Sequence, residues 1–128
     1  MDWTKPTTQL LGRFQPWHKG HTELFKRAID KTGQVAILLR ASDGTDENPY
    51  DFDQRSTQIV IALAKEGFYS GEDYTIINVP NIEHITYGRD VGYTIEQEKL
   101  EDNIEAISAT NIRKGLQQIA ATHPKVDG

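Results

Sequence analysis

The sequence predicts an α/β protein with a Rossmann-like, doubly wound parallel sheet in a single compact domain. Apolar segments of strand length alternate with segments whose apolar residues recur at helical spacing, in the order strand, helix, strand, helix, strand. The 128 residues match the common size of one domain, and a charged content of 26% is ordinary for a folded chain. Because neighbouring parallel strands need crossover connections, we expect the helices to provide them in the right-handed sense.

The first two predicted strands enclose the first predicted helix. Residues 7–11 are expected to form a strand, and residues 22–31 a helix with its apolar side chains on one stripe. Gly33 follows at the position where a helix commonly ends in a left-handed residue. Residues 34–40 contain a continuous apolar run, which is typical of a central parallel strand covered on both faces.

A loop and a second helix come next. Residues 41–50 are rich in Ser, Asp, Gly, Asn and Pro, which indicates a loop. Phe52 or Asp53 opens a helix that is expected to run to about Glu66, and Gly67 is the expected residue after its end.

The C-terminal part is predicted to add two strands and a last helix. Residues 74–79 form the third strand, and residues 93–100 alternate like a half-exposed fourth strand. Ser108 is expected to cap the last helix. Within the single domain of residues 1–128, we expect residues 1–6 and 122–128 to be flexible.

Composition and charge exclude several classes of function. A net charge of −5 argues against a polyanion such as nucleic acid as the main partner. The chain has no cysteine, so a disulfide framework and a thiolate metal site are both excluded. No segment approaches the roughly 20 apolar residues that cross a bilayer, and the first residues lack the apolar region of a signal peptide. We therefore expect no membrane association and a cytoplasmic location.

Residues 12–21, Gly-Arg-Phe-Gln-Pro-Trp-His-Lys-Gly-His, carry the strongest chemical signal. They gather two imidazoles, a lysine and an arginine around a turn from a strand into a helix. Backbone N–H groups and the positive end of the helix dipole favour an anion at such a turn. His18 and His21 are three residues apart, so their side chains can converge on the same oxygens, and Gly20 leaves room for a phosphate against the backbone. This pattern predicts a phosphate site.

Two other interpretations of the histidine pair remain. A zinc site needs a third ligand, and the spacing of His84, His123 and the carboxylates does not provide one, so no metal ligand is predicted. Alternatively, one histidine caps the helix and the other is solvated. The surrounding residues Gly12, Arg13 and Phe14 favour the phosphate site.

Residues 107–114 repeat the same logic near the C-terminus. Ser108 and Thr110 place hydroxyls at a helix start, and Arg113 places a planar cation one turn later. The alternative is that Ser108 is only a cap and Arg113 only a surface charge. Two such sites in one small domain can hold a triphosphate between them.

These two segments resemble the HxGH and ISSTxIR signatures of the nucleotidylyltransferase superfamily. Residues 12–21 are especially similar to the turn of the archaeal-type nicotinamide mononucleotide adenylyltransferases. The likeness continues through residues 47–50, through Arg55, and through residues 79–82.

The sequence departs from those adenylyltransferases in two places. Ala109 stands where a second serine is usual, and residues 85–93 form a short stretch where the family carries a further strand and helix. In length the chain is closer to the compact glycerol-3-phosphate cytidylyltransferases, whose histidine turn lacks the Arg-Phe-Gln-Pro sequence.

The resemblance implies transfer of a nucleotidyl group from ATP or CTP to a small phosphorylated acceptor, with Mg²⁺ bound mainly through the triphosphate. In the manner of the superfamily, His18 and His21 donate to the α- and β-phosphates and Lys19 adds charge. The expected phosphate- and nucleotide-binding residues are Gly12, Arg13, Phe14, Gly20, Ser108, Thr110 and Arg113.

Four further residues are weaker candidates for substrate contacts. Arg55 can bind phosphate or form a surface ion pair, and Trp17 can stack on a base or cover the edge of the sheet. Arg89 can bind the acceptor phosphate and Asp90 a ribose hydroxyl, but an aspartate-stabilised turn explains the same pair.

Three functions follow as hypotheses: an adenylyltransferase acting on nicotinamide mononucleotide or a similar phosphomonoester, a cytidylyltransferase that activates a small phosphorylated alcohol, and a module that senses a nucleotide without turning it over. Release of pyrophosphate distinguishes the first two from the third. Because relatives of this fold are commonly oligomers, we also expect a homo-oligomer.

Overall fold

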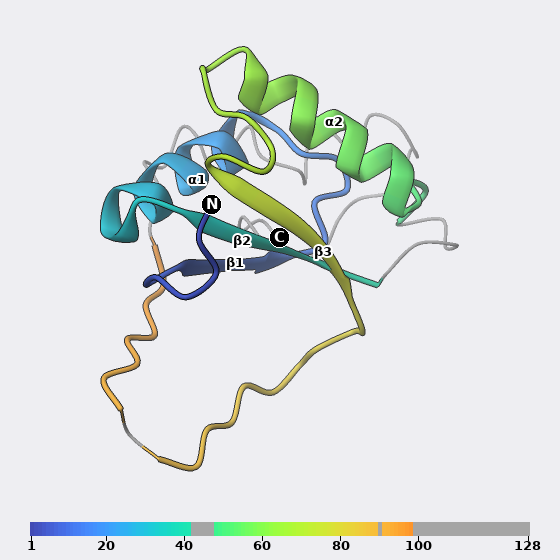
Figure 1. Cartoon of the computed structure of the whole chain (residues 1–128). Coiled ribbons are helices and arrows are strands. Elements are labelled where there is room, and N and C mark those ends of the chain that lie inside the picture. The colour runs from blue at the N-terminus through green and yellow to red at the C-terminus, as the bar shows by residue number, and fades with distance from the viewer. Residues whose placement is uncertain (42–47, 90, 99–128) are drawn as a thin grey trace.

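The computed structural model of the chain describes residues 1–41, 48–89 and 91–98. They form three strands and two helices, which are β1 (Thr8–Gly12), α1 (Lys19–Thr32), β2 (Val35–Arg40), α2 (Phe52–Ala64) and β3 (Tyr74–Val79). The strands make one parallel sheet in the order β1-β2-β3, as Figure 1 shows. The predicted α/β class with a Rossmann-like parallel sheet is therefore confirmed.

Helices α1 and α2 lie on the same face of the sheet (Figure 1). This follows from two right-handed crossovers that step across the sheet in the same direction. The second helical layer of a doubly wound sheet would require the last predicted helix, which lies outside the described residues. Between the sheet and its helices lies one apolar core, composed of Phe14, Trp17, Phe25, Ala28, Val35, Ile37, Leu39, Ile59, Leu63 and Tyr74.

Strand β2 is central, as its apolar run predicts. Ile37 lies opposite Leu10 of β1 and Ile76 of β3. The side chains of β2 alternate between fully buried and half-buried, so the face that carries Ala36 and Leu38 is covered only in part. The core lies on the helical face.

Both helices begin with a capping box. At α2, the side chain of Asp51 accepts the N–H of Gln54 at 2.8 Å, and the side chain of Gln54 accepts the N–H of Asp51 at 3.0 Å. Helix α1 begins three residues before the predicted residue 22, because His18 caps it. Gly33 ends α1 in the left-handed conformation, as predicted, with φ 89°.

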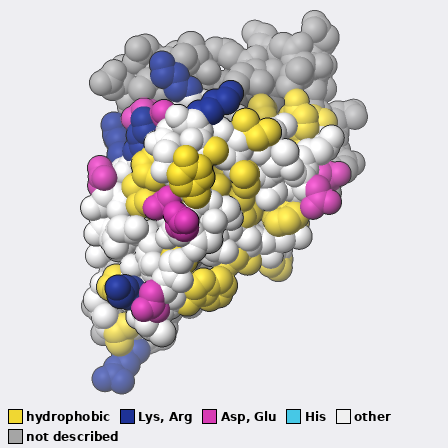
Figure 2. Space-filling model, turned by 45° about the horizontal axis from the view of Figure 1, so that its top comes forward, with side chains coloured by type: hydrophobic (Ala, Val, Ile, Leu, Met, Phe, Trp, Pro, Cys, Tyr) yellow, Lys and Arg dark blue, Asp and Glu magenta, His cyan; other side chains and the backbone are white. Residues whose placement is uncertain are grey.

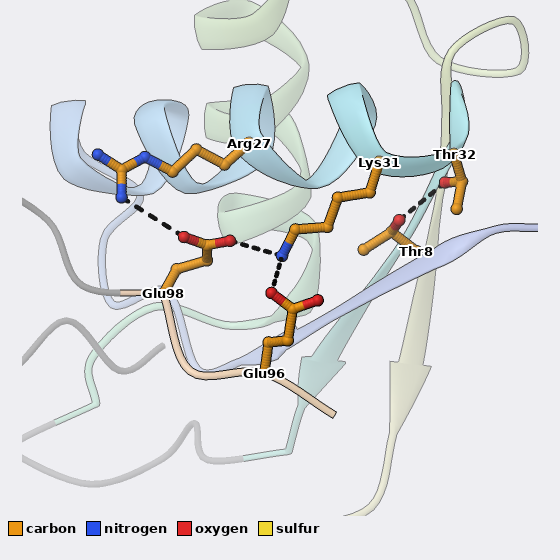
Figure 3. A network of polar contacts seen from close by, with 6 residues as sticks. All are labelled: Thr8, Arg27, Lys31, Thr32, Glu96 and Glu98. Carbon is orange, nitrogen blue, oxygen red and sulfur yellow. Dashed lines mark hydrogen bonds and ion pairs between the residues drawn. The ribbon is translucent and has the colours of Figure 1, made fainter. Parts of the chain in front are cut away.

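The prediction of a fourth strand at residues 93–100 is wrong for the part that is described. The described residues between 80 and 98, which are 80–89 and 91–98, leave β3 and run as an extended segment away from the sheet and back toward α1 (Figure 1, yellow to orange). Near its end, two glutamates form ion pairs with α1, as Figure 3 shows. Glu98 lies 3.5 Å from Arg27 and also pairs with Lys31. Glu96 lies 3.4 Å from Lys31. The alternating pattern is present, but the segment lies along a helix rather than along a strand that could pair with it.

The residues before β1 are held by hydrogen bonds to Gln34. Gln34 is buried, and its amide nitrogen donates to the carbonyl of Asp2 at 2.6 Å and to the hydroxyl of Thr7 at 2.7 Å. Its side-chain oxygen accepts the N–H of Asp2 at 3.2 Å. These bonds attach residues 1–6, which we expected to be flexible, to the start of β2; residues 122–128 lie outside the described part.

The outer surface of α2 leaves Val60 and Ile61 exposed. Hydrophobic side chains are interspersed with charged ones on the face that Figure 2 shows, and among the described residues no histidine is visible there. None of the described helices combines the length and the apolar character that a membrane span needs.

Candidate active site

The histidine turn, residues 12–21, connects the carboxyl end of β1 to the first residues of α1. Gly12 is the last residue of β1 and Lys19 the first residue of α1. In open α/β sheets, ligands bind beyond the carboxyl ends of the strands, and a helix N-terminus attracts anions. The turn therefore lies where the sequence predicted it.

Two imidazoles form the capping box of α1. His18 Nδ1 accepts the N–H of Gly20 at 2.9 Å, and His21 Nδ1 accepts the N–H of His18 at 3.2 Å. The rings stack with their centroids 3.8 Å apart. Both histidines thus cap the helix, whereas the simple alternative gave this role to only one.

The capping bonds also determine which nitrogen of each ring carries the proton. A nitrogen that accepts a hydrogen bond has no proton, so the neutral rings of His18 and His21 carry theirs on Nε2. Both Nε2 atoms are buried. The arrangement provides two N–H donors of fixed orientation at the positive end of a helix, which suits developing negative charge on phosphate oxygens.

Aromatic rings hold His21 in place. The ring of Phe14 meets His21 edge-on with centroids 4.8 Å apart, and Trp17 lies 5.4 Å from the same ring. The Trp17 indole N–H donates to the hydroxyl of Thr22 at 2.9 Å. Because Phe14 and Trp17 are 1% and 7% exposed, they belong to the core. Stacking of Trp17 on a base, one of the two predicted roles, is therefore not what the structure favours.

The four basic residues of the turn differ in exposure. Lys19 is exposed, His18 and Arg13 are half-buried, and His21 is fully buried. An incoming phosphate can approach Lys19 directly, whereas contact with the Nε2 of either histidine requires the atoms that cover it to move aside. Gly20, the glycine of the motif, is buried at the start of α1 and donates its N–H to the cap.

Arg55 is neither a surface ion pair nor an exposed substrate ligand. Its side chain is fully buried, and its Nη1 donates to the carbonyls of Arg13 and Arg40, both at 2.9 Å. Its Nε donates to the carbonyl of Asp51 at 3.3 Å. One guanidinium thereby connects the histidine turn to the end of β2 and the start of α2. Arg55 is therefore not a surface charge, and its binding of phosphate stays a prediction.

Sequence reasoning assigned no role to Gln15. This side chain is 1% exposed; its amide nitrogen donates to the carbonyl of Tyr50 at 2.7 Å, and its oxygen accepts the N–H of Tyr50 at 2.9 Å. Asn48 lies nearby, and its side-chain oxygen is 3.4 Å from Arg13 Nη1. No local pattern could reveal these partners, because 35 residues separate each pair.

The remaining predicted site residues are not brought to the turn by the described structure. Arg89 is exposed on the segment of residues 80–98, and within the described ranges no hydrogen bond or ion pair connects it to the histidines. Asp90, Ser108, Thr110 and Arg113 lie outside the described residues.

The described residues offer no group of three His, Asp or Glu side chains that could hold a metal ion.

Several known proteins are similar in sequence to this chain. The sequence pattern of the cytidylyltransferase-like family matches residues 10–114. Among similar proteins, the nicotinamide-nucleotide adenylyltransferase of Thermoplasma acidophilum is 33% identical over 94 residues, which cover 66% of this chain and 52% of that protein. The enzyme of the same name from Ignicoccus hospitalis is 36% identical over 73 residues, 56% of this chain and 42% of that protein. The chain thus spans about half the length of these relatives or less.

A solved structure shares the fold. It is a bifunctional NMN adenylyltransferase/ADP ribose pyrophosphatase from Francisella tularensis, with a TM-score of 0.54 and 27% identity. The match covers 59% of this chain and 22% of that one. The similarity therefore concerns part of this chain and a smaller part of the other.

Proposed function

The chain belongs to the cytidylyltransferase-like family, a branch of the nucleotidylyltransferases, and we propose that it transfers an adenylyl group from ATP to nicotinamide mononucleotide or a similar phosphomonoester. The observation that carries this proposal is the pair of imidazoles that cap α1 with their Nε2–H donors fixed. The archaeal relatives named as nicotinamide-nucleotide adenylyltransferases support the choice of ATP and of the acceptor.

In the proposed reaction, an oxygen of the acceptor phosphate attacks the α-phosphorus of ATP. A new phosphorus–oxygen bond forms, the bond between the α-phosphorus and its bridging oxygen breaks, and pyrophosphate leaves with the electron pair. His18 and His21 donate from Nε2 to phosphate oxygens on which negative charge increases in the transition state. The chain needs no nucleophile of its own, because positioning and charge stabilisation provide the rate.

Lys19 adds a positive charge at the exposed start of α1, where pyrophosphate would separate. Mg²⁺ bound to the triphosphate would neutralise part of the charge on the leaving group. Ser108, Thr110 and Arg113 remain the predicted ligands of the β- and γ-phosphates, and self-association remains a prediction.

The test is a pyrophosphate-release assay on the full chain with Mg²⁺. ATP, CTP, GTP and UTP are each combined with nicotinamide mononucleotide and with a panel of small phosphomonoesters. We expect the fastest release with ATP and nicotinamide mononucleotide, with the dinucleotide identified by mass spectrometry. Pyrophosphate release with CTP and an acceptor, but not with ATP, would support the cytidylyltransferase instead. Binding of ATP without release of pyrophosphate would support a nucleotide sensor.

A further inference from the structure

The histidine turn cannot determine its own position within the protein. Its two capping bonds are local, since they join residues two and three apart. Phe14 adopts a left-handed backbone with φ 52°, which a residue with a side chain seldom does unless tertiary contacts hold it there. The position of the imidazoles relative to the sheet must therefore come from contacts outside the turn.

Gln15 makes such a contact. Both polar atoms of its amide are bonded to the backbone of Tyr50, at 2.7 and 2.9 Å, and the side chain is 1% exposed. Tyr50 directly precedes Asp51, the N-cap of α2. The amide thus attaches the histidine turn to the start of the second helix. It donates one hydrogen bond to the backbone of Tyr50 and accepts one from it, as the backbone of a paired strand does.

Arg55 strengthens the same connection from the other side. It lies in the first turn of α2 and donates to the carbonyl of Arg13 at 2.9 Å. Gln15 and Arg55 therefore both connect the histidine turn to the beginning of α2. Of the two, Gln15 is closer in sequence to His18 and carries no charge, so it can be replaced without burying an unbalanced one.

We propose that Gln15 is a positioning residue for the adenylyl transfer, because its amide fixes the histidine turn against Tyr50 and so places the two imidazole donors; this rests on the proposed function. Donors that stabilise the transition state must be positioned accurately, because a displacement of about 1 Å can lower the rate about 100-fold. The loss of Gln15 should therefore affect kcat more than the KM for ATP.

The chain offers a matched control in Gln34. This glutamine is also buried and also bonds to the backbone of a distant segment, at Asp2 and Lys5. It precedes β2, at the amino edge of the sheet, whereas Gln15 lies at the carboxyl edge. Gln15→Met and Gln34→Met thus remove similar contacts from opposite edges of the sheet.

The experiment measures thermal midpoint, kcat and KM for wild type and both variants with ATP, nicotinamide mononucleotide and Mg²⁺. We expect both variants to melt a few degrees below wild type. Gln15→Met should lower kcat at least about tenfold with the KM for ATP changed less than about threefold, and Gln34→Met should keep the wild-type kcat. Gln15→Asn, whose shorter amide cannot reach both atoms of Tyr50, serves in the same comparison should Gln15→Met not fold.

Two failures can be told apart. Wild type that releases no pyrophosphate overturns the proposed function and the positioning role together. Active wild type with equal kcat in the Gln15 and Gln34 variants overturns the positioning role alone, because both glutamines would then serve only stability.

Discussion

The histidine turn and the segment of residues 80–98 are both irregular connections, yet they are held in opposite ways. The turn is fixed by buried hydrogen bonds from Gln15 and Arg55. The segment is held near its ends by Arg40, which donates to the carbonyl of Ile82 at 3.5 Å, and by ion pairs of Glu96 and Glu98 with α1. Five of its apolar side chains, at positions 85, 87, 91, 93 and 95, are 48–64% exposed.

The difference shows which contacts impose one conformation. A buried polar group that loses its partner costs free energy, so the turn can adopt only the arrangement that satisfies Gln15 and Arg55. An exposed ion pair exchanges its partner for water at little cost, so it can attach a segment without shaping it. Of these two regions, the one to which we assign the proposed chemistry is the one with buried partners.

The largest expected contrast is between two arginines. Arg55→Met removes the donor to the carbonyls of Arg13, Arg40 and Asp51, and we expect it to lower the free energy of unfolding by about 3 kcal/mol or more. Arg27→Met removes an exposed ion pair with Glu98, and we expect a change within about 0.5 kcal/mol. Urea unfolding measures both. Equal losses would mean that the two regions are held equally strongly.

The next contrast concerns two histidines. At position 21, glutamine can still accept the N–H of His18, as in an ordinary capping box, so His21→Gln should fold. It lacks the imidazole donor, so we expect turnover to fall at least about 100-fold. His84→Gln changes an exposed histidine of residues 80–98 and should leave turnover unchanged. Pyrophosphate release compares the two, and an unchanged rate in His21→Gln would remove His21 from the mechanism.

Two tyrosines extend the comparison to stability and pH. The hydroxyl of Tyr74 is buried and has no hydrogen-bond partner among the described residues, so Tyr74→Phe should stabilise the chain by about 1 kcal/mol. Burial also raises the pKa of Tyr74 above 10.0. The folded state therefore disfavours the ionised form of Tyr74, so stability is unaffected by this titration below pH 10.0 and falls as the pH rises above it.

Thermal unfolding between pH 7 and pH 11 tests this expectation. Wild type should lose stability at the alkaline end more steeply than Tyr74→Phe, whereas the exposed Tyr93→Phe should behave like wild type. A Tyr74→Phe variant less stable than wild type would show that the hydroxyl has a partner.

The smallest effect is expected in the ion pairs of Figure 3. The Lys31 ammonium lowers the pKa of Glu98 below 4.5, and Glu98 raises the pKa of Lys31. The stability from this pair is thus present above pH 4.5 and is lost as the pH falls below it. Because both side chains contact water, Lys31→Met should cost well under about 1 kcal/mol at pH 7.

The difference in thermal midpoint between wild type and Lys31→Met should therefore close as the pH falls toward 3. Lys65→Met, at the end of α2, changes a lysine for which the described residues show no ion pair and should give a difference that does not depend on pH below 7. A difference in thermal midpoint between wild type and Lys31→Met that stays constant below pH 4.5 would contradict the role of Glu98.

Much of the described fold follows from local patterns. The spacing of apolar residues predicted all five described elements, with residues 74–79 matching β3 and residues 52 to about 66 matching α2 to within two residues. The same approach predicted a fourth strand that is not formed over residues 93–98, because alternation describes how a strand would be covered but supplies no neighbour to pair with.

Local sequence patterns sufficed for the order of strands and helices and for the gathering of His18, Lys19 and His21 at the start of α1, since these depend on residues within about four positions of one another. The tertiary structure alone decided that Trp17 is part of the core and that Arg55 bonds to carbonyls 15 and 42 residues away. It also decided that Gln15 bonds to Tyr50, 35 residues away. Such contacts form only where folding brings distant groups out of water together, because a buried donor or acceptor must then find a partner within the protein.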